Sequence, residues 1–430
     1  MSDRQLRIFS LNCWGLKFIA KDRDERIRAI AAALAASQHD VICLQEIWVF
    51  ADFERVRDAA AGRLPHSKFF YSGALGAGLA ILSHFPIVAT AVHPYSLNGA
   101  PMDVGAGDWF VGKAAATATI LHPILGLVQI FNTHLFAKGG EDGPEYNRAH
   151  RLVNAWEFAK LARQAAELGR HVIAAGDFNS IPTTLPMEVI RAHAGLLDAW
   201  AVTHPNPAAG AATPQEALAR FGVTADSPLN TYSAAKPLDS HARAHWGKRL
   251  DYVLYRQPVR AGPHPRLRAT QCRVALTEIV PGCAFSYSDH FGLEATLAIE
   301  DPTQEDALAA PAEPTEVSEV AVAAFLQALG ACYSFARERA RKELTGFVLC
   351  LVLVVALAIG SSWLPHSWIN PIFIIFTVFV SWAGTTLLYE GFLYGQWECN
   401  ALMNVIEELE IYKKGLDLQR RHSQSLSRSA

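Results

Sequence analysis

Short apolar runs, most of them ending in a polar residue, divide the first 300 residues of this chain. Runs rich in Ile, Val, Leu and Phe and bounded by turn residues favour β-strands. The predicted strands cover 6–11, 41–44, 79–83, 114–120, 127–132, 172–175, 252–255 and 293–299. Helical spacing of apolar positions predicts helices over 22–36 and 148–167. Several strands follow one another without a helix, so we expect an α/β domain with a mixed sheet or sheet pair.

The hydrophobic pattern is lost in two segments. Between 203 and 248 prolines, alanines and isolated charges follow no period, which indicates a surface insertion near the rim of a site. The segment 301–319 is rich in acids, prolines and alanines and is typical of a linker. We therefore expect a catalytic domain over 1–300 that is held on a flexible connection.

The chain after the linker has the pattern of a membrane hairpin. A helix is expected over 320–345, followed by two segments without charged side chains, 346–364 and 371–389. Each is close to the ~20 residues needed to cross a ~30 Å hydrocarbon layer. A buried hairpin of a soluble protein is the alternative, but it normally carries polar residues on one helix face. A C-terminal helix and tail are expected over 390–430.

Charge and cysteine usage predict how this hairpin is oriented. Lys and Arg precede the first span and follow the second, which favours a cytosolic position for both ends. The N-terminus lacks the apolar core of a signal peptide, and the seven cysteines form no CxxC pair. The catalytic domain is therefore expected in the reducing cytosol; the pattern does not indicate which organelle membrane holds the hairpin.

The overall charge disfavours a nucleic-acid partner. The 430 residues carry a formal net charge of -3, and the isoelectric point is about 6.6. Binding to nucleic acid depends on Lys and Arg that neutralise phosphates. We expect no nucleic acid as partner, and the sequence gives no indication of the oligomeric state.

Six polar signatures occur in a fixed order at the ends of apolar runs. Cleavage of a phosphodiester needs charge neutralisation, an in-line nucleophile and a proton for the leaving oxygen, which acids, amides and histidines supply. The signatures are Asn12-Cys13-Trp14-Gly15, Gln45-Glu46, Asn132-Thr133-His134-Leu135, Gly176-Asp177-Phe178-Asn179, Leu250-Asp251-Tyr252 and Ser288-Asp289-His290. We expect them to converge on one cleft that binds a divalent metal ion.

Three residues are candidate metal ligands. Glu46 closes an apolar strand, where a carboxylate is held rigidly enough to bind Mg²⁺; the alternative is a surface carboxylate or a helix cap. Asn12, at another strand end, offers an uncharged oxygen, although Asn is also a common turn residue. Asp289 is the third candidate.

The Asp177-Phe178-Asn179 string has two readings. If the chain stays extended, the side chains of Asp177 and Asn179 point to the same side, and an Asx turn is the alternative. In a catalytic site Asp177 would position the attacking water or bind metal. Asn179 would donate to a phosphoryl oxygen.

His290 is the candidate general base. Neighbouring residues of a strand point apart, so Asp251 is better placed than Asp289 to orient its imidazole. A carboxylate that holds one ring nitrogen raises the basicity of the other. His134 would stabilise the phosphoryl oxyanion or assist the leaving group.

These strings resemble the endonuclease/exonuclease/phosphatase superfamily over roughly residues 6–300. The segments 10–15, 97–99 and 107–113, with the two C-terminal spans, are similar to neutral sphingomyelinases and inositol phosphosphingolipid phospholipases C. The resemblance implies a DNase I-like four-layer sandwich of two mixed sheets flanked by helices. It also implies Mg²⁺, with Mn²⁺ as an alternative, on Glu46 and Asn12. Further, it implies Asp177 and Asn179 at the phosphate, His290 oriented by Asp251 as the base, and His134 opposite.

The loop 107–113 contains an acid and a lysine, Asp108 and Lys113, that are further candidates for a functional role. Its glycine spacing is not that of a Walker motif, and Lys113 could contact the phosphate or be held off by Asp108. By resemblance, this pair would form a switch that responds to anionic lipid; a surface ion pair is the alternative. Trp109 and Phe110 would dip into the bilayer interface or pack in the core.

The sequence thus predicts a membrane-anchored, Mg²⁺-dependent hydrolase of the phospholipase C type. Its expected substrate is a sphingolipid, either sphingomyelin or an inositol phosphosphingolipid, and anionic phospholipid is an expected activator. Alternatives are a phospholipase C acting on lysophospholipid, a nuclease and an inositol-polyphosphate phosphatase. An inactive membrane scaffold is the non-enzymatic alternative.

Overall fold

The computed structural model divides the chain into two compact units. The first consists of residues 1–98, 107–143 and 150–321, and the second of 99–106, 144–149 and 322–430. The structure describes residues 4–105, 107–140, 143–205, 210–234, 236–302 and 316–429.

The described part of the first unit contains two six-stranded sheets. One sheet has the order β11-β12-β1-β2-β4-β3 and the other β5-β6-β7-β8-β10-β9. The strands are β1 Gln5–Asn12, β2 Val41–Gln45, β3 His66–Phe70, β4 Leu79–Ser83, β5 Ile87–Pro94, β6 Ala114–His122, β7 Gly126–His134, β8 His171–Asp177, β9 Leu197–Asp198, β10 Asp251–Arg256, β11 Arg266–Ala275 and β12 Gly292–Glu300.

Each sheet is mixed, as expected. β1 pairs with β2 in parallel, and β7 pairs with β8 in parallel. The other ladders between named strands are antiparallel. The parallel pairs matter for function because their carboxyl ends meet at one edge of each sheet.

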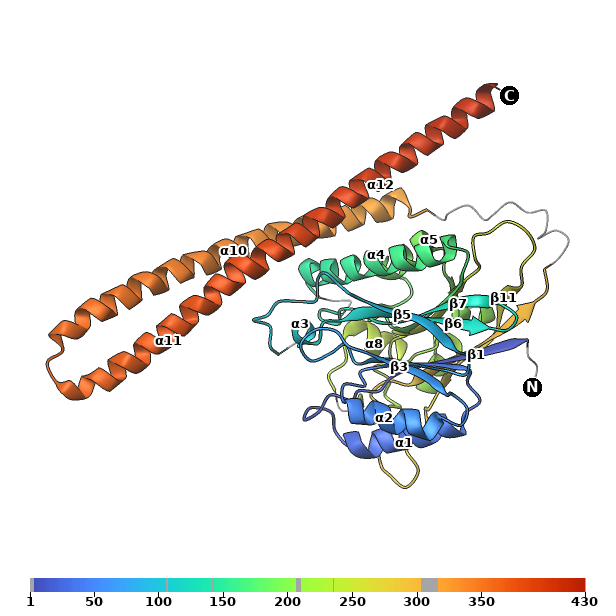
Figure 1. Cartoon of the computed structure of the whole chain (residues 1–430), viewed down its shortest axis with the longest axis horizontal. Helices are drawn as coiled ribbons and strands as arrows, with labels where there is room; N and C mark the ends of the chain where they lie inside the picture. Colours follow the sequence, from blue (N-terminus) through green and yellow to red (C-terminus); the bar gives the residue numbers. More distant parts are fainter. Residues whose placement is uncertain are drawn as a thin grey trace. The chain divides into compact units, whose positions relative to one another are not determined.

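Helices cover the outer faces of both sheets (Figure 1). The helices of this unit are α1 Arg23–Ala36, α2 Phe50–Ala60, α3 Asp108–Val111, α4 Glu145–Glu167, α5 Leu185–Ala194, α6 Ala199–Thr203, α7 Pro214–Phe221 and α8 Ser240–His245. Side chains of α1 and α2 pack with the outer residues of β1, β2 and β4. Those of α4 and α5 pack with β7, β8 and β10. The result is the expected four-layer sandwich.

The two-residue period of the strands sorts their side chains between the layers. In β1, Leu6 and Ile8 lie in the core between the sheets, whereas Phe9 and Leu11 lie in the outer core beneath α1 and α2. Because both faces of these strands are buried, their sequences are nearly continuous apolar runs.

A polar bridge joins the two sheets through the middle of the sandwich. Asn132, on β7, donates through Nδ2 to the carbonyl oxygens of Leu44 (2.8 Å) and Ala80 (2.9 Å) in the other sheet. Its Oδ1 accepts a hydrogen bond from Nε2 of Gln45 at 2.7 Å. Both side chains are fully buried. Both belong to the sequence signatures, and their function here is to hold the sheets in register.

The segment 203–248 is more structured than its irregular pattern suggested. Its described part contains α7 and α8, and buried polar side chains such as Thr224 and Asn230. Ala225 forms isolated β-bridges with Lys248 and His290. The segment therefore packs against the catalytic elements; residues 206–209 and 235 lie outside the described part.

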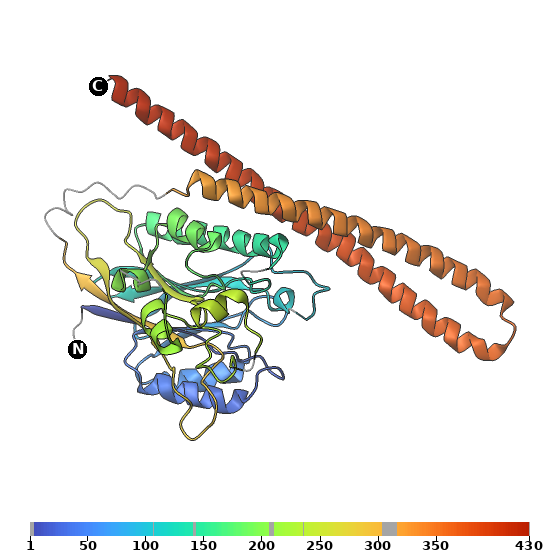
Figure 2. The ribbon, with the colours of Figure 1, turned by 180° about the vertical axis from the view of Figure 1, so that it is seen from behind.

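The second unit is dominated by a long helical hairpin, whose arms run side by side in Figures 1 and 2. Its elements are α10 Glu319–Gly360, short 3-10 turns at Ser361–Trp363 and Ser367–Ile369, α11 Asn370–Leu388, a π-helical stretch Tyr389–Tyr394 and α12 Gly395–Ser429. The arms approach closely at two glycines: a Cβ on Gly384 would lie 3.1 Å from Cβ of Cys350, and one on Gly346 would lie 3.0 Å from Leu387. Small residues at such contacts are typical of membrane helices.

Two helices of this unit are long and apolar enough to cross a membrane. In the most apolar window, 0% of the first helix and 11% of the second is buried. The helix of a buried soluble hairpin would be covered by protein instead. The expected boundaries of the linker and spans remain predictions, and residues 303–315 of the linker lie outside the described part.

The bridge between the sheets can be tested by a double-mutant cycle. Asn132→Leu and Gln45→Leu should each lower the free energy of unfolding, by about 1–3 kcal/mol, because each leaves a buried polar partner without a hydrogen bond. The double variant should lose less than the sum of the singles. Thermal unfolding of the detergent-solubilised chain measures this; strictly additive losses would contradict the bridge.

Candidate active site

The inner-facing row of side chains on several strands ends in a polar residue at the same edge of the sandwich. His134, Asp177 and Asp251 occupy directly paired positions on the neighbouring strands β7, β8 and β10. In the opposite sheet the row of Leu6 and Ile8 continues at the same two-residue period to Asn12. The fold therefore brings residues from distant parts of the sequence together between the two sheets.

Asn12 links the carboxylates of both sheets. Its Nδ2 donates to Oε1 of Glu46 and to Oδ2 of Asp177, each at 3.1 Å. Its Oδ1 accepts from the backbone N–H of Trp14 at 3.0 Å. Two acids from opposite sheets thus converge on one amide.

His290 faces the same acids from the segment that precedes β12. Its Nδ1 lies 2.8 Å from Oδ2 of Asp251, and its Nε2 lies 3.9 Å from Oδ2 of Asp177. Burial by itself would lower the pKa of His290, but the carboxylates of Asp251 and Asp177 outweigh it and raise the pKa well above its usual value. The arrangement leaves Nε2 directed into the cleft.

The acids of the cleft are destabilised in their charged form. Burial, followed by the charge of Asp289, raises the pKa of Glu46. Burial also raises the pKa of Asp177, helped by Asp251. Cations in the cleft would relieve this strain, because they favour the ionised carboxylates.

Lys113 supplies one such cation. Its Nζ lies 3.0 Å from Oδ1 of Asp108 and 3.0 Å from Nε2 of His134, and it donates to the carbonyl of Leu135 at 2.9 Å. Lys113 is 2% exposed and Asp108 6%, so the pair is buried and differs from the surface ion pair considered as an alternative. Burial and the Lys113 charge lower the pKa of His134 well below its usual value, which keeps its imidazole neutral.

The backbone between Asp177 and Asn179 does not stay extended. Asn179 has a φ of 47°, and its N–H donates to Oδ1 of Asp177 at 2.9 Å in an Asx turn. Its Nδ2 donates to the carbonyl of Leu135 at 3.0 Å. The turn leaves Oδ2 of Asp177 facing Asn12 and places Asn179 beside the Lys113 contact.

The remaining candidates lie at the margin of the site. Asp289 is half-buried, and its Oδ2 lies 3.5 Å from Nζ of Lys236, a residue of the 203–248 segment. Trp109 and Phe110 are half-buried and pack edge to face, with ring centroids 5.0 Å apart. They are neither fully exposed nor fully in the core.

Strained backbone surrounds the site, which the sequence pattern did not predict. Trp14, Glu46 and Asn179 have φ values of 45°, 53° and 47°. Such conformations cost free energy and cluster where function requires them. Gly15 allows the close approach, since a Cβ there would lie 2.5 Å from the carbonyl oxygen of Glu46. Two signals were present in the sequence: Gly15 close after Asn12, and the Asx turn considered for the Asp177–Asn179 string.

The donor set fits a hard divalent cation. Glu46 and Asp177 present carboxylate oxygens, which are ligands preferred by Mg²⁺ and Mn²⁺, whereas Asn12 faces them with Nδ2 and would bind metal only with its amide turned over. Oδ1 of Asp251 is buried without a hydrogen-bond partner among the described residues. Ligand atoms of Asp177, Asp251 and His290 also lie within 4.8 Å of one another. The excess of buried acid is the physical reason to expect a metal here.

Comparison with known proteins agrees with this geometry. Residues 9–290 match the model of the Endonuclease/Exonuclease/phosphatase family. The chain belongs to this family. An inositol phosphosphingolipids phospholipase C of Schizosaccharomyces pombe is 36% identical, and the match covers 95% of this chain and 94% of that protein. The Homo sapiens sphingomyelin phosphodiesterase 2 is 31% identical over 70% of this chain and 67% of its own length.

A solved structure, that of SmcL, has the same fold. It is 18% identical, with a TM-score of 0.50, and the match covers 68% of this chain and 99% of that one. Together these comparisons confirm the expected DNase I-like fold and the expected relationship to sphingomyelinases and inositol phosphosphingolipid phospholipases C. They also confirm the expectation of a phosphodiester hydrolase.

The buried Lys113 gives a prediction that separates catalysis from folding. Lys113→Ala should lower kcat by at least about tenfold, because it removes a buried positive charge beside His134, where we expect the phosphoryl group to bind. Lys113→Arg keeps the charge and should retain more activity. Turnover on lipid vesicles and thermal unfolding are measured in parallel. Full activity of a folded Lys113→Ala variant would contradict a role for this lysine.

Proposed function

We propose that this protein is a membrane-anchored, divalent-metal-dependent hydrolase of the phospholipase C type. It cleaves the phosphodiester of a sphingolipid on the ceramide side. The observation that carries this proposal is the convergence of the His290–Asp251 pair with the Glu46–Asn12–Asp177 cluster, in which Nε2 of His290 lies 3.9 Å from Oδ2 of Asp177. A base close to a candidate metal site is what in-line displacement at phosphorus needs.

In the proposed reaction, His290 activates the attacking water. Asp251 fixes Nδ1, so Nε2 accepts a proton from water as its oxygen bonds to phosphorus. Asp177, 3.9 Å from the same Nε2, orients that water. The bond between phosphorus and the ceramide oxygen breaks, the ceramide oxygen takes up a proton from solvent, and His290 returns the proton from water to solvent. The products are ceramide and the phosphorylated head group.

Donors from the second sheet stabilise the phosphoryl group. Lys113 brings a positive charge to His134, and Asn179 lies next to both through the carbonyl of Leu135. These groups are held before substrate binds, so little reorganisation accompanies the reaction. Mg²⁺ held by Glu46 and Asn12, with Asp289 nearby, would when bound neutralise phosphoryl charge and offset the negative field that raises the pKa of His290.

The similarity over the whole chain favours a sphingolipid over other phosphodiesters. The Schizosaccharomyces pombe phospholipase C matches through the C-terminal hairpin, as does a Saccharomyces cerevisiae protein of the same name, 30% identical over 94% of this chain. This makes an inositol phosphosphingolipid the first candidate substrate. Sphingomyelin is the second, because the human relative named for it is 31% identical over 70% of this chain. A lysophospholipid remains a less supported alternative.

Two exposed apolar residues shortly after Asn12 in the chain also favour a lipid substrate. Phe18, in the segment that follows Asn12, is 94% exposed although its φ of 73° is strained for a non-glycine residue. Its neighbour Ile19 is also exposed. Apolar side chains presented to solvent at this energetic cost suit contact with a bilayer. A soluble nuclease or phosphatase substrate gives no reason for them.

The function can be tested with a substrate panel. The purified full chain in vesicles should hydrolyse inositol phosphosphingolipid or sphingomyelin, lose activity with a chelator and regain it with Mg²⁺. His290→Ala should lower kcat by about 10³-fold or more, as loss of a general base does. His264→Ala, at a half-buried histidine outside the cleft, is the matched control.

Hydrolysis of DNA or soluble inositol phosphates in preference to sphingolipids would contradict the proposed substrate. Activity that survives in His290→Ala would contradict the mechanism. Absence of any turnover, with the fold intact, would favour the inactive scaffold.

The orientation of the hairpin is a separate prediction. Lys and Arg residues near both ends favour a cytosolic side for the catalytic unit and the C-terminus. Protease added to sealed microsomes should therefore digest both the catalytic unit and a C-terminal epitope, while the 346–389 segment stays protected. Protection of either end would overturn this topology.

A further inference from the structure

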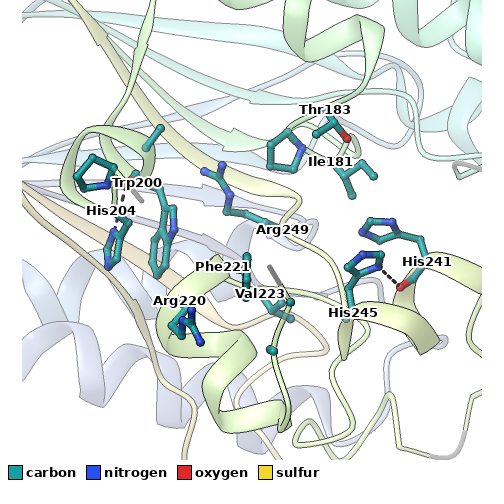
Figure 3. A pocket seen from close by; sticks show the side chains of 16 residues that line it. Ile181, Thr183, Trp200, His204, Arg220, Phe221, Val223, His241, His245 and Arg249 are labelled. Atoms are coloured by element: carbon teal, nitrogen blue, oxygen red, sulfur yellow. Dashed lines mark hydrogen bonds between the residues drawn. The ribbon is translucent and has the colours of Figure 1, made fainter. Parts of the chain in front are cut away.

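A separate pocket lies beside the active site, between α6, α7, α8 and the segment after Asn179. Its volume is about 520 Å³, within the range of small-molecule sites. Figure 3 shows its lining. The proposed reaction does not use this pocket, so a ligand that binds there would have a different function.

The interior of the pocket is apolar and its edge is basic. The buried side chains of Ile181, Trp200 and Val223 form part of the wall. His245 is exposed and His204 half-buried, so imidazoles lie toward solvent. The described lining contains no carboxylate. This combination suits a molecule with a hydrocarbon body and an anionic or hydrogen-bond-accepting end.

The basic side chains of the pocket differ in whether an acidic side chain already pairs with them. Arg249 is paired with Asp198 at 2.7 Å, and Arg220 is paired with Glu216. His245 stacks on His241 with ring centroids 4.1 Å apart, and its Nδ1 contacts the carbonyl of His241 at 3.0 Å. The imidazole of His245 therefore has its position fixed while its other nitrogen stays available to a ligand.

The indole of Trp200 is already covered by its neighbours. One face of the Trp200 indole is stacked by His204, with centroids 4.1 Å apart and an angle of 5°. Gly222 lies against the indole too, where an added Cβ would come within 2.7 Å of it. A sugar or base therefore could not stack on this indole, whereas a flexible chain needs only apolar walls.

The walls of the pocket are continuous with the catalytic elements. Ile181 follows Asn179 by two residues and Arg249 precedes Asp251 by two, so each wall begins within roughly 8 Å of a site residue along the chain. Thr224, next to Val223, accepts hydrogen bonds through Oγ1 from the N–H groups of Leu250 and Asp251. A molecule in the pocket would therefore contact the segments that position the catalytic groups.

We infer that this pocket binds a single-chain anionic amphiphile: one hydrocarbon chain against Ile181, Trp200 and Val223, with its polar end at the histidines of α8. A separate lipid such as a fatty acid supplies both parts; a chain of the lipid substrate would supply only the hydrocarbon part, because its phosphodiester lies at the catalytic residues. The inference does not depend on the proposed reaction, since binding can be observed without turnover.

Photolabelling of the full chain tests the inference. The probe is palmitic acid that carries a diazirine on its chain, added to protein reconstituted in vesicles. Labelled peptides identified by mass spectrometry should include the 199–223 region. Label on the 346–389 spans serves as an internal reference for probe in the bilayer.

Two neighbouring residues give a matched pair of variants. Ala201 is exposed and lines the pocket, whereas Val202 is exposed and does not line it. Ala201→Trp should fill the pocket and lower labelling of 199–223 by about tenfold, the loss expected for ~1.4 kcal/mol of binding free energy. Val202→Trp should leave it unchanged. Equal labelling in both variants, or label confined to the spans, would overturn the inference.

Two further experiments test the charge of the ligand and its source. His241→Ala combined with His245→Ala should reduce labelling by the acid more than by the corresponding uncharged alcohol; an equal reduction would contradict the anionic end. In the His290→Ala background, competition by the sphingolipid would identify the occupant as a substrate chain and would overturn the single-chain anionic ligand. Labelling that the sphingolipid leaves unchanged, while Ala201→Trp still abolishes it, identifies a separate lipid.

Discussion

The structure depends on the packing of two sheets whose inner-facing rows all end at the same edge. Because strand side chains alternate with a period of two, the residues that build the central core also determine which polar groups reach the cleft. His134, Asp177 and Asp251 lie side by side in one sheet, and Asn12 meets them from the other. A slip of one residue in any of these strands would turn its polar group to the outer face. The buried bridge between Gln45 and Asn132 opposes such a slip.

The same arrangement places buried acids and strained backbone, both of which cost folding free energy, at the catalytic residues. Burial raises the pKa values of Glu46 and Asp177, and the backbone is strained at Glu46 and Asn179. These costs are tolerated because the layers around the site are closely packed and highly apolar. A buried lysine and a bound cation would complete the charge balance. The pocket beside the site depends on the same packing, since its walls continue from the backbone of the catalytic residues.

Much of this organisation follows from the sequence, and the remainder has definite physical reasons. Strand ends such as Asn12 and Asp177 were found because apolar runs stop there. Edge strands such as β5 were not predicted, since their exposed residues show no clear alternation. The buried position of the Asp108–Lys113 pair and the order in 203–248 depend on tertiary packing, which leaves no local pattern. Likewise, the positive φ of Glu46 is imposed by its neighbours rather than by its own residue type.

The most direct test of this account is to locate the metal ion itself. Anomalous diffraction from crystals of the full chain with Mn²⁺ should place the ion against the carboxylate of Glu46, in the cleft that Asn12 and Asp177 share. The His290 imidazole should lie across the cleft, in contact with Asp251 and not with the ion. An ion bound away from Glu46, or one coordinated by His290, would contradict the division of the site into a metal side and a base side.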